Sequence, residues 1–378
     1  MGCGAFSIYP ISDAPTGLTI SRHALGRIKK LGALYDATTD RFCGTTIFPK
    51  RFPLEHQAEI HRTGNTQSES RYVKVRSLQE KFDELNVTGE LQLSVLAGML
   101  GLPGECGSEC KIGAFVKYIN QEKKSFTSKE SIQIYNVKTK THQLEIDPDK
   151  KRFIPLRRMI DLGATHAVTE IEWGATCVVS VTEQKYEVEK KKEVQGGIFG
   201  GLNWILGKLS GSNTEVETEE ITDTTIKIFA DALLPGPVPQ TWEEAQDMMR
   251  KLSQQITKSN EGKGKPITYV MTPLSCLDWR KPLQPFKTFT SVGEVRITNV
   301  VRLFDHMTEL RQKVHDRIKH DDSGRERRRE ADLRVYKASV KDEFARLLKN
   351  VRSGKENAKC LDAFCDKHRQ TAEQIFNE

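Results

Sequence analysis

The sequence predicts an α+β fold in which a β-rich part precedes a bundle of α-helices. From His23 to about residue 290, short runs alternate between apolar and polar residues and are separated by Gly, Pro and Asn. After Asn299, apolar residues instead recur every three or four positions, which is the period of an amphipathic helix. The chain has 378 residues, enough for two or three domains. We expect an N-terminal tail at 1–22, a sheet domain at 23–290 and a helical domain at 291–378.

The clearest strand pattern begins at Ala167. Its alternation places two sets of residues on opposite faces: Ala167, Thr169, Ile171 and Trp173 on one, and Val168, Glu170 and Glu172 on the other. Gly174 follows and has no side chain, so a strand can bend sharply there or another backbone can come close. The pattern therefore predicts a strand with one buried face that reaches Gly174.

Three amphipathic helices are predicted near the C-terminus, with breaks at 321–324 and 353–354. The positions expected to face the core are Val300, Leu303, Phe304, Met307, Leu310, Val314 and Ile318, then Leu333, Tyr336, Val340, Phe344, Leu347 and Val351, then Leu361, Phe364, His368, Ala372 and Ile375. A basic run at 325–329 opens the second helix. Because acidic residues lie beside it, a solvated helix end is favoured over a nucleic-acid contact.

The composition, with 37% hydrophobic and 29% charged residues, is typical of a soluble globular protein. A formal net charge of +7 allows contact with anionic lipid or nucleic acid without requiring either. No apolar run approaches the roughly 20 residues of a membrane-spanning helix, and the N-terminus lacks the pattern of a signal peptide. We therefore expect a protein that is cytoplasmic as synthesised and that binds no nucleic acid.

Nothing in the sequence favours an enzyme. His166 has no nucleophile and orienting acid at a recognisable spacing, so we expect a structural histidine. Nucleotide-binding, zinc-protease and serine-hydrolase motifs are absent. The eight cysteines do not form two ligand pairs at zinc spacing, so free thiols are expected. We expect no catalytic residue, no cofactor and no metal site.

The residues around His166 also carry a resemblance to a known family. Gly163-Ala164-Thr165-His166, followed by Gly174, is similar to the Gly-Thr-His…Gly-Gly signature of the membrane-attack-complex/perforin/cholesterol-dependent-cytolysin superfamily. The likeness narrows to the N-terminal domain of the stonefish-toxin-like branch, stonustoxin and verrucotoxin. The segments that resemble this domain occur in the same order as in the family: 24–27, 31–36, 118–120, 162–181, 233–245 and 270–278. Gly163, Thr165, His166 and Gly174 are expected to carry the fold signature and the bend.

The resemblance implies a bent antiparallel perforin-like sheet with flanking helical clusters, followed by a C-terminal α-helical bundle. It places a long central strand at Ala167–Val181, with the bend near Gly174. In this superfamily the helical clusters unfurl into amphipathic β-hairpins that close into an oligomeric barrel. The fish toxins continue into thioredoxin-like and lectin-like domains, which this chain is expected to lack.

A barrel strand needs about 9–11 residues with alternate positions apolar, and two segments meet this requirement. The apolar candidates are Val87, Leu91, Leu93 and Val95 in 87–95, and Val216, Ile226 and Ile228 in 214–228. Between 186 and 194, Lys190 and Lys192 lie on the face that would meet lipid, where each costs roughly 2–4 kcal/mol at the bilayer centre. Those lysines must lie at an interface, or this hairpin does not insert.

A glycine-rich apolar segment at 196–209 lies between the two arms of the second candidate hairpin. Its candidate lipid-contacting residues are Ile198, Phe199, Leu202, Trp204, Ile205 and Leu206. The segment can be a helix buried against the sheet, a hairpin tip that enters lipid first, or both in two states. We expect it to be shielded in the soluble form, with Trp204 among the first residues to enter lipid.

Two functions from different classes follow. The favoured hypothesis is a non-enzymatic pore-forming protein that oligomerises, with itself or a related subunit, and inserts β-hairpins into a lipid membrane in toxicity, defence or lysis. Release by a non-classical route would bring it to its target membrane. The alternative is an intracellular scaffold or immune-signalling module that keeps the fold and never inserts. The segments at 87–95 and 214–228 favour insertion, whereas Lys190 and Lys192 favour the alternative.

Overall fold

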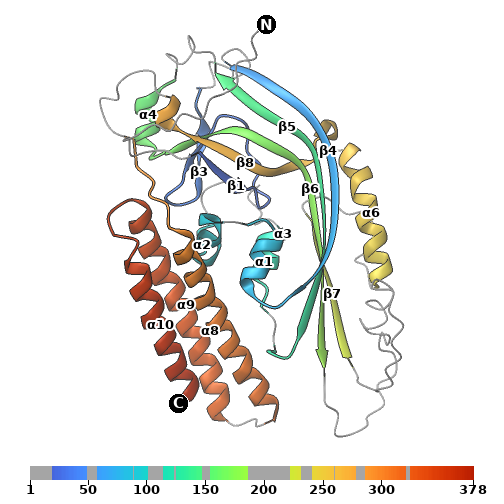
Figure 1. Cartoon of the computed structure of the whole chain (residues 1–378), viewed down its shortest axis with the longest axis vertical. Coiled ribbons are helices and arrows are strands. Elements are labelled where there is room, and N and C mark those ends of the chain that lie inside the picture. Colours follow the sequence, from blue (N-terminus) through green and yellow to red (C-terminus); the bar gives the residue numbers. More distant parts are fainter. Residues whose placement is uncertain are drawn as a thin grey trace.

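A strongly curved sheet lies beside an upright bundle of helices (Figure 1). This is a computed structural model, and it describes residues 19–48, 58–87, 89–100, 114–122, 125–146, 154–185, 222–230, 241–258, 260–277, 286–320 and 324–378. The class is α+β with an antiparallel sheet and C-terminal helices, as the sequence predicts.

The described strands form one antiparallel sheet of eight strands. They are β1 (Ile20–His23), β2 (Ala33–Asp36), β3 (Arg41–Thr46), β4 (Ala58–Val75), β5 (Lys129–Ile146), β6 (His166–Lys185), β7 (Thr222–Ala230) and β8 (Lys265–Pro273). The central strand is β6, which pairs with β5 along most of its length, with β2 and β8 near its start and with β7 near its end. The strand expected at Ala167–Val181 is therefore confirmed within β6. Residues 20–22, expected in the tail, instead pair with β8.

The sheet changes its partners at Gly174. Pairing of β6 with β8 ends at Gly174, and pairing with β7 starts at Cys177. The β5–β6 register also shifts there, between Lys138 and Lys140, which leaves one extra residue in β5 and increases the local twist. A Cβ atom built on Gly174 would lie 1.8 Å from the carbonyl oxygen of Val137. Position 174 therefore requires glycine, because the β5 backbone occupies the space that a side chain at this position would fill.

Helices cover both faces of the lower half of the sheet. On one face lie α1 (Leu78–Glu84), α2 (Glu90–Leu96) and α3 (Ala114–Ile119), which we call the first helical cluster. On the other face lies α6 (Trp242–Lys258) (Figure 1). Val178 of β6 packs in the core on the side of the cluster, while its neighbours Cys177 and Val179 pack with α6. This two-sided burial explains the continuous apolar run in β6.

Three shorter helices join the strands: α4 (Leu156–Asp161) precedes β6, η3 (Asn260–Gly262) precedes β8, and α7 (Leu274–Leu277) follows β8. The upper part of the sheet has a core of its own, which includes Tyr35, Ile171 and Tyr269.

The helical domain consists of α8 (Glu294–His320), α9 (Gly324–Arg352) and α10 (Cys360–Asn377). The second break predicted, at 353–354, follows the end of α9, whereas the first, at 321–324, lies outside the described residues except for Gly324, which begins α9; α8 begins before Asn299. Every apolar position predicted for the core is buried or half-buried. The rings of Phe304, Phe344 and Phe364, one from each helix, meet at centroid distances of 5.6 Å. The same core includes residues of the first helical cluster, so the helical domain and this cluster are packed together.

Replacing Gly174 by Val should destabilise the protein, because the side chain would collide with the β5 backbone. We expect a loss at the upper end of the about 1–3 kcal/mol typical of overpacking, measured by urea unfolding. The matched control is Gly64→Val, since Gly64 also lies beside a register shift but has open space around a built Cβ. Equal stability of the two variants would show that the close approach at Gly174 is unimportant.

Candidate functional site

The first predicted insertion segment is helical and buried in this structure. Val87 follows α1, and Leu91, Leu93 and Val95 lie in α2. The polar residues that alternation placed on the opposite face, including Glu90 and Ser94, are buried as well. In this state residues 90–95 therefore do not form an amphipathic strand, because they belong to α2, whose residues are all buried. Their insertion as a strand stays a prediction for the membrane-bound state.

The second predicted segment is described only in part. Ile226 and Ile228 lie in β7, are half-buried and pack against the core shared with α6. The other candidates lie outside the described residues: Ile198, Phe199, Leu202, Trp204, Ile205, Leu206 and Val216, together with Lys190 and Lys192. The role of this segment in membranes stays a prediction.

The signature residues join β6 to β2. Gly163, with φ of +65°, lies just after α4. The Thr165 hydroxyl accepts a hydrogen bond from the amide of Ala37 at 2.8 Å and lies 3.2 Å from the carbonyl oxygen of Tyr35. His166 Nδ1 lies 2.8 Å from the same hydroxyl, and the ring is buried. These contacts fix the start of the central strand.

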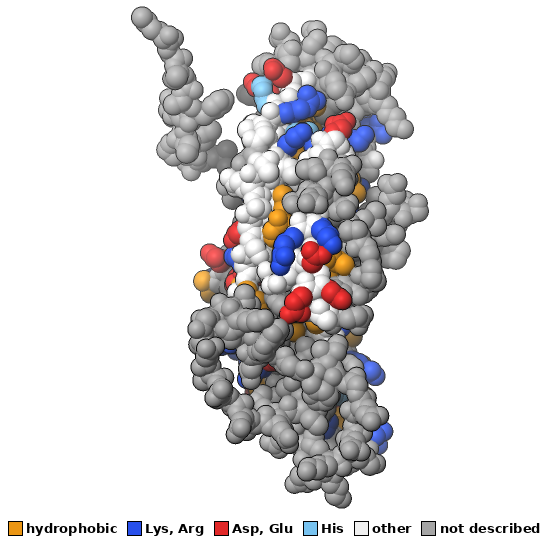
Figure 2. Space-filling model, turned by 90° about the vertical axis from the view of Figure 1, so that its right-hand side faces the viewer, with side chains coloured by type: hydrophobic (Ala, Val, Ile, Leu, Met, Phe, Trp, Pro, Cys, Tyr) orange, Lys and Arg blue, Asp and Glu red, His pale blue; other side chains and the backbone are white. Residues whose placement is uncertain are grey.

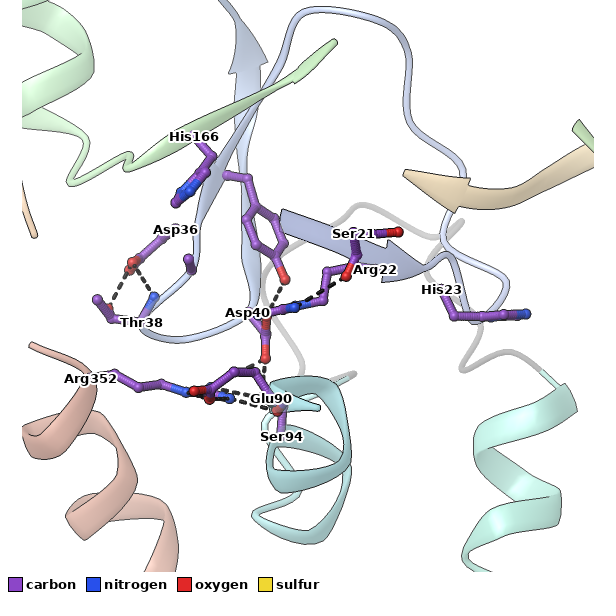
Figure 3. Close-up of polar contacts among 12 residues, drawn as sticks. Ser21, Arg22, His23, Asp36, Thr38, Asp40, Glu90, Ser94, His166 and Arg352 are labelled. Atoms are coloured by element: carbon purple, nitrogen blue, oxygen red, sulfur yellow. Dashed lines mark hydrogen bonds and ion pairs between the residues drawn. The ribbon is translucent and has the colours of Figure 1, made fainter. Parts of the chain in front are cut away.

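A buried arginine connects the helical domain, the first helical cluster and the sheet (Figure 3). Arg352, the last residue of α9, has no solvent-exposed side-chain surface. Its Nη2 lies 2.7 Å from Oε2 of Glu90 in α2, and its Nη1 lies 3.2 Å from Oδ2 of Asp40, which precedes β3. Nη1 also donates to the Ser94 hydroxyl at 2.7 Å, and Nη2 donates to the Glu90 carbonyl at 2.6 Å. One guanidinium thus contacts α2 through two side chains and a backbone oxygen.

Asp40 is the shared carboxylate of this network. Its other oxygen lies 3.2 Å from Nε of Arg22 in β1 and accepts a hydrogen bond from the Tyr35 hydroxyl. Burial alone would raise the pKa of Asp40, but the charges of Arg352 and Arg22, with the Ser94 and Tyr35 hydroxyls, lower it to about 2. Asp40 therefore stays ionised at neutral pH between two buried arginines.

A second buried contact holds the cluster to the sheet. Lys81 of α1 lies 3.0 Å from Oε2 of Glu130 in β5, and the Ser180 hydroxyl of β6 donates to the other oxygen of Glu130 at 2.9 Å. The Lys81 ammonium also lies 4.6 Å from the centre of the Tyr118 ring of α3. Burial, with the negative charge of Glu130, raises the pKa of the Tyr118 hydroxyl.

Less buried contacts continue along the helical domain. The Leu78 amide at the start of α1 donates to Oδ1 of Asp305 in α8 at 3.1 Å. Glu122, just after α3, lies 2.6 Å from the ammonium of Lys337 in α9 and also pairs with Arg311 of α8. Burial would raise the pKa of Glu122, but these two cations lower it.

Sequence reasoning missed the residues of this network. Arg352 and Asp40 are separated by 312 positions, and no motif links them. Glu90 is the only charged residue in 87–95. The alternation places it opposite the apolar residues of this segment, whereas α2 turns it toward Arg352.

The described residues contain no cluster of potential metal ligands. None of the described helices combines the length and apolar character needed to cross a bilayer. On the described part of the face in Figure 2, acidic and basic side chains are interspersed. On α6, Asp247 and Lys251 form an ion pair.

Comparisons with known proteins agree with the fold. The sequence model of the family described as "SNTX, MACPF/CDC-like domain" matches residues 19–281. Cytolytic toxin-beta of Scorpaena plumieri is 24% identical over 311 residues, which cover 80% of this chain and 41% of the toxin. Stonustoxin subunit alpha of Synanceia horrida is 24% identical over 375 residues, which cover 92% of this chain and 49% of the subunit. The chain thus spans less than half the length of these relatives.

A solved stonustoxin structure superposes with a TM-score of 0.56 at 15% identity, covering 95% of this chain and 48% of that one. At this identity the likeness shows the fold. The similar proteins are named as toxins or toxin subunits, and none of these names describes an enzyme.

Replacing Arg352 by Gln should cost about 3–5 kcal/mol, because it leaves Glu90 buried without its counter-charge. Unfolding in urea measures the loss, and limited proteolysis should show earlier cleavage within 76–100. The matched control is Arg346→Gln, an exposed arginine of the same helix, which should change stability by less than about 0.5 kcal/mol. Similar stabilities would mean that the network contributes little.

Replacing Asp40 by Asn should also cost about 3–5 kcal/mol near pH 6, because two buried arginines lose a shared counter-charge. The folded-state pKa of Asp40, about 2, lies below its ordinary value of 3.8. Its stabilisation is therefore present above about pH 4 and is lost as the pH falls toward 2. Unfolding at several pH values should show the difference between wild type and variant shrinking below pH 4. A constant difference would contradict the depressed pKa.

Proposed function

The chain belongs to the family of SNTX, MACPF/CDC-like domains, and from this premise we propose that it is a non-enzymatic protein that perforates membranes as part of an oligomer. In this proposal the first helical cluster leaves its site, extends as a β-hairpin and inserts into lipid. The partners are a lipid membrane and either further copies or a related subunit. Relatives named as alpha and beta subunits support the second choice. Synthesis in the cytoplasm followed by non-classical release is part of the same proposal.

The proposal rests on the residues at which the paired strands β4–β5 and β6–β7 end. Strands β4 and β5 remain paired to Val75 and Glu130, directly beside the segment that contains the first helical cluster. Strands β6 and β7 remain paired to Lys185 and Thr222, beside the segment that contains 196–209. The first helical cluster and the segment 196–209 therefore each lie, along the sequence, between two antiparallel strands that are already in register. Extending these hairpins requires no change in the strand order.

The edges of the sheet support assembly. Among the described strands, β4 pairs only with β5, and β7 pairs only with β6. Edge strands leave one row of backbone amides and carbonyls without sheet partners. If β4 of one subunit paired with β7 of the next, the edges would be satisfied and the sheet could close into the barrel that lipid requires.

Locking the first helical cluster to the helical domain tests the proposal. Leu78→Cys/Asp305→Cys introduces two thiols at the contact in which the Leu78 amide lies 3.1 Å from the Asp305 carboxylate, and the loss of both thiols on oxidation shows that the disulfide has formed. The oxidised protein should bind liposomes but release no dye, because docking needs only the surface whereas insertion needs the cluster to leave. Adding a reductant should restore release.

The control for this experiment is Asp305→Cys alone, which should leak under oxidising and reducing conditions alike. Full leakage with the disulfide formed would remove the first helical cluster from the mechanism. Absence of leakage by the wild-type protein, with every lipid mixture and after proteolysis, would instead support a scaffold that never inserts.

A further inference from the structure

We propose that the protein binds a small organic polyphosphate in a pocket between the first helical cluster and the helical domain. This pocket, which we call the seam pocket, has a volume of about 530 Å³. One wall is formed by the segment that begins α1 and by the end of α3, and the other by α8 and α9. Pockets for small organic ligands have volumes of roughly 300–1,000 Å³, whereas a single inorganic ion needs far less.

Three of the cations in the wall have no side-chain partner in the described part of the chain. They are Arg76, just before α1, and Arg334 and Lys341 on α9. The other two cations are already paired: Lys81 with Glu130 at 3.0 Å and Lys337 with Glu122 at 2.6 Å. Arg76 and Arg334 are exposed and Lys341 is half-exposed, so a ligand can reach all three.

Among the described residues, the three carboxylates of the wall form no ion pair with these three cations, and the five cations of the wall outnumber them. Glu122 pairs with Lys337 and Arg311. Asp305 accepts from the Leu78 amide at 3.1 Å, and Glu309 pairs with Lys313 at 2.6 Å. The pocket therefore presents uncompensated positive charge, which favours an anionic ligand.

The spacing of the cations indicates more than one anionic group. Arg334 and Lys341 are seven residues apart on one face of α9, which separates their Cα atoms by about 10 Å. Arg76 belongs to the opposite wall. A ligand that contacts all three must carry several anionic groups on a body that fills the space. Phosphate groups are suited to arginine, whose planar guanidinium can donate two parallel hydrogen bonds.

Lys341 also connects the pocket to the first helical cluster. A Cβ built on Gly98, just after α2, would lie 2.6 Å from Cε and 3.0 Å from Nζ of Lys341. A polyphosphate held by Arg76 on one wall and by Lys341 and Arg334 on the other would bridge the two parts. It would bind the packed state and not the released state, and would therefore oppose release. This consequence rests on the proposed function, whereas binding itself does not.

The experiment is calorimetric titration of the purified chain with inositol hexakisphosphate, using inorganic phosphate as the small-anion comparison. The test variant is Arg334→Gln/Lys341→Gln. The matched control is Arg346→Gln/Lys349→Gln, which removes the same charge from exposed positions of α9 that do not line the pocket. We expect about tenfold or greater loss of affinity in the test variant and at most about a twofold change in the control. Inorganic phosphate should bind much more weakly to all three proteins.

Equal loss in both variants would overturn the proposal, because it would show only general attraction to a basic chain. Lack of binding by the wild-type protein would overturn it as well. Vesicles containing a polyphosphoinositide distinguish the source of the phosphates. Binding that depends on Arg334 and Lys341 with soluble ligand alone indicates a free polyphosphate, and the same dependence on vesicles indicates a lipid headgroup.

Dye release tests the consequence separately. Inositol hexakisphosphate should slow release by the wild-type protein and have little effect on the test variant. If the ligand binds the pocket but dye release is unchanged, the binding site is supported and its proposed effect on the first helical cluster is wrong. If the wild-type protein never releases dye, the proposed function fails while the titration still decides the site.

Discussion

The structure depends on the contact of one buried arginine with two carboxylates from distant parts of the chain. Arg352 ends α9, Glu90 lies in α2, and Asp40 belongs to the turn before β3. A buried charge without partners costs several kcal/mol, so these groups are tolerated only when all three segments are in place. The network therefore contributes specificity of arrangement more than net stability. It makes the position of the first helical cluster depend on both the sheet and the helical domain.

In the proposed function, the first helical cluster is stable in the present state and leaves it on membranes. Apolar residues such as Phe82, Leu91 and Leu93 are fully buried in the present state, and each contributes about 1.5–3 kcal/mol to it. Moving the cluster into lipid would again shield the apolar groups from water, so their loss from this core can be offset. The buried ion pairs have no such replacement in lipid. If the cluster leaves as proposed, the barrier lies mainly in the charged contacts, and mild acid does not remove the contact at Asp40, whose pKa is about 2.

Much of the fold could be predicted from the sequence because it is set by local periodicity. The helical domain followed from apolar residues three and four apart, and the central strand followed from alternation up to Gly174. The first helical cluster shows the limit of this reasoning. In 87–95 the alternation of apolar and polar residues is compatible with a strand, but residues 90–96 form the buried helix α2, in which Glu90 and Ser94 face Arg352. Pairing of a carboxylate with an arginine more than 200 positions away leaves no periodic trace, so no window of sequence could have revealed it.

In the proposed mechanism, the first helical cluster separates from the helical domain on membranes while the rest of the fold persists. Hydrogen exchange of the protein before and after binding to liposomes follows this separation. Backbone amides at 78–96 and 114–119 should lose their helical protection on liposomes and then regain protection as strands, while α8, α9 and α10 stay protected throughout. Unchanged protection of 78–96 in protein that is releasing dye would contradict it.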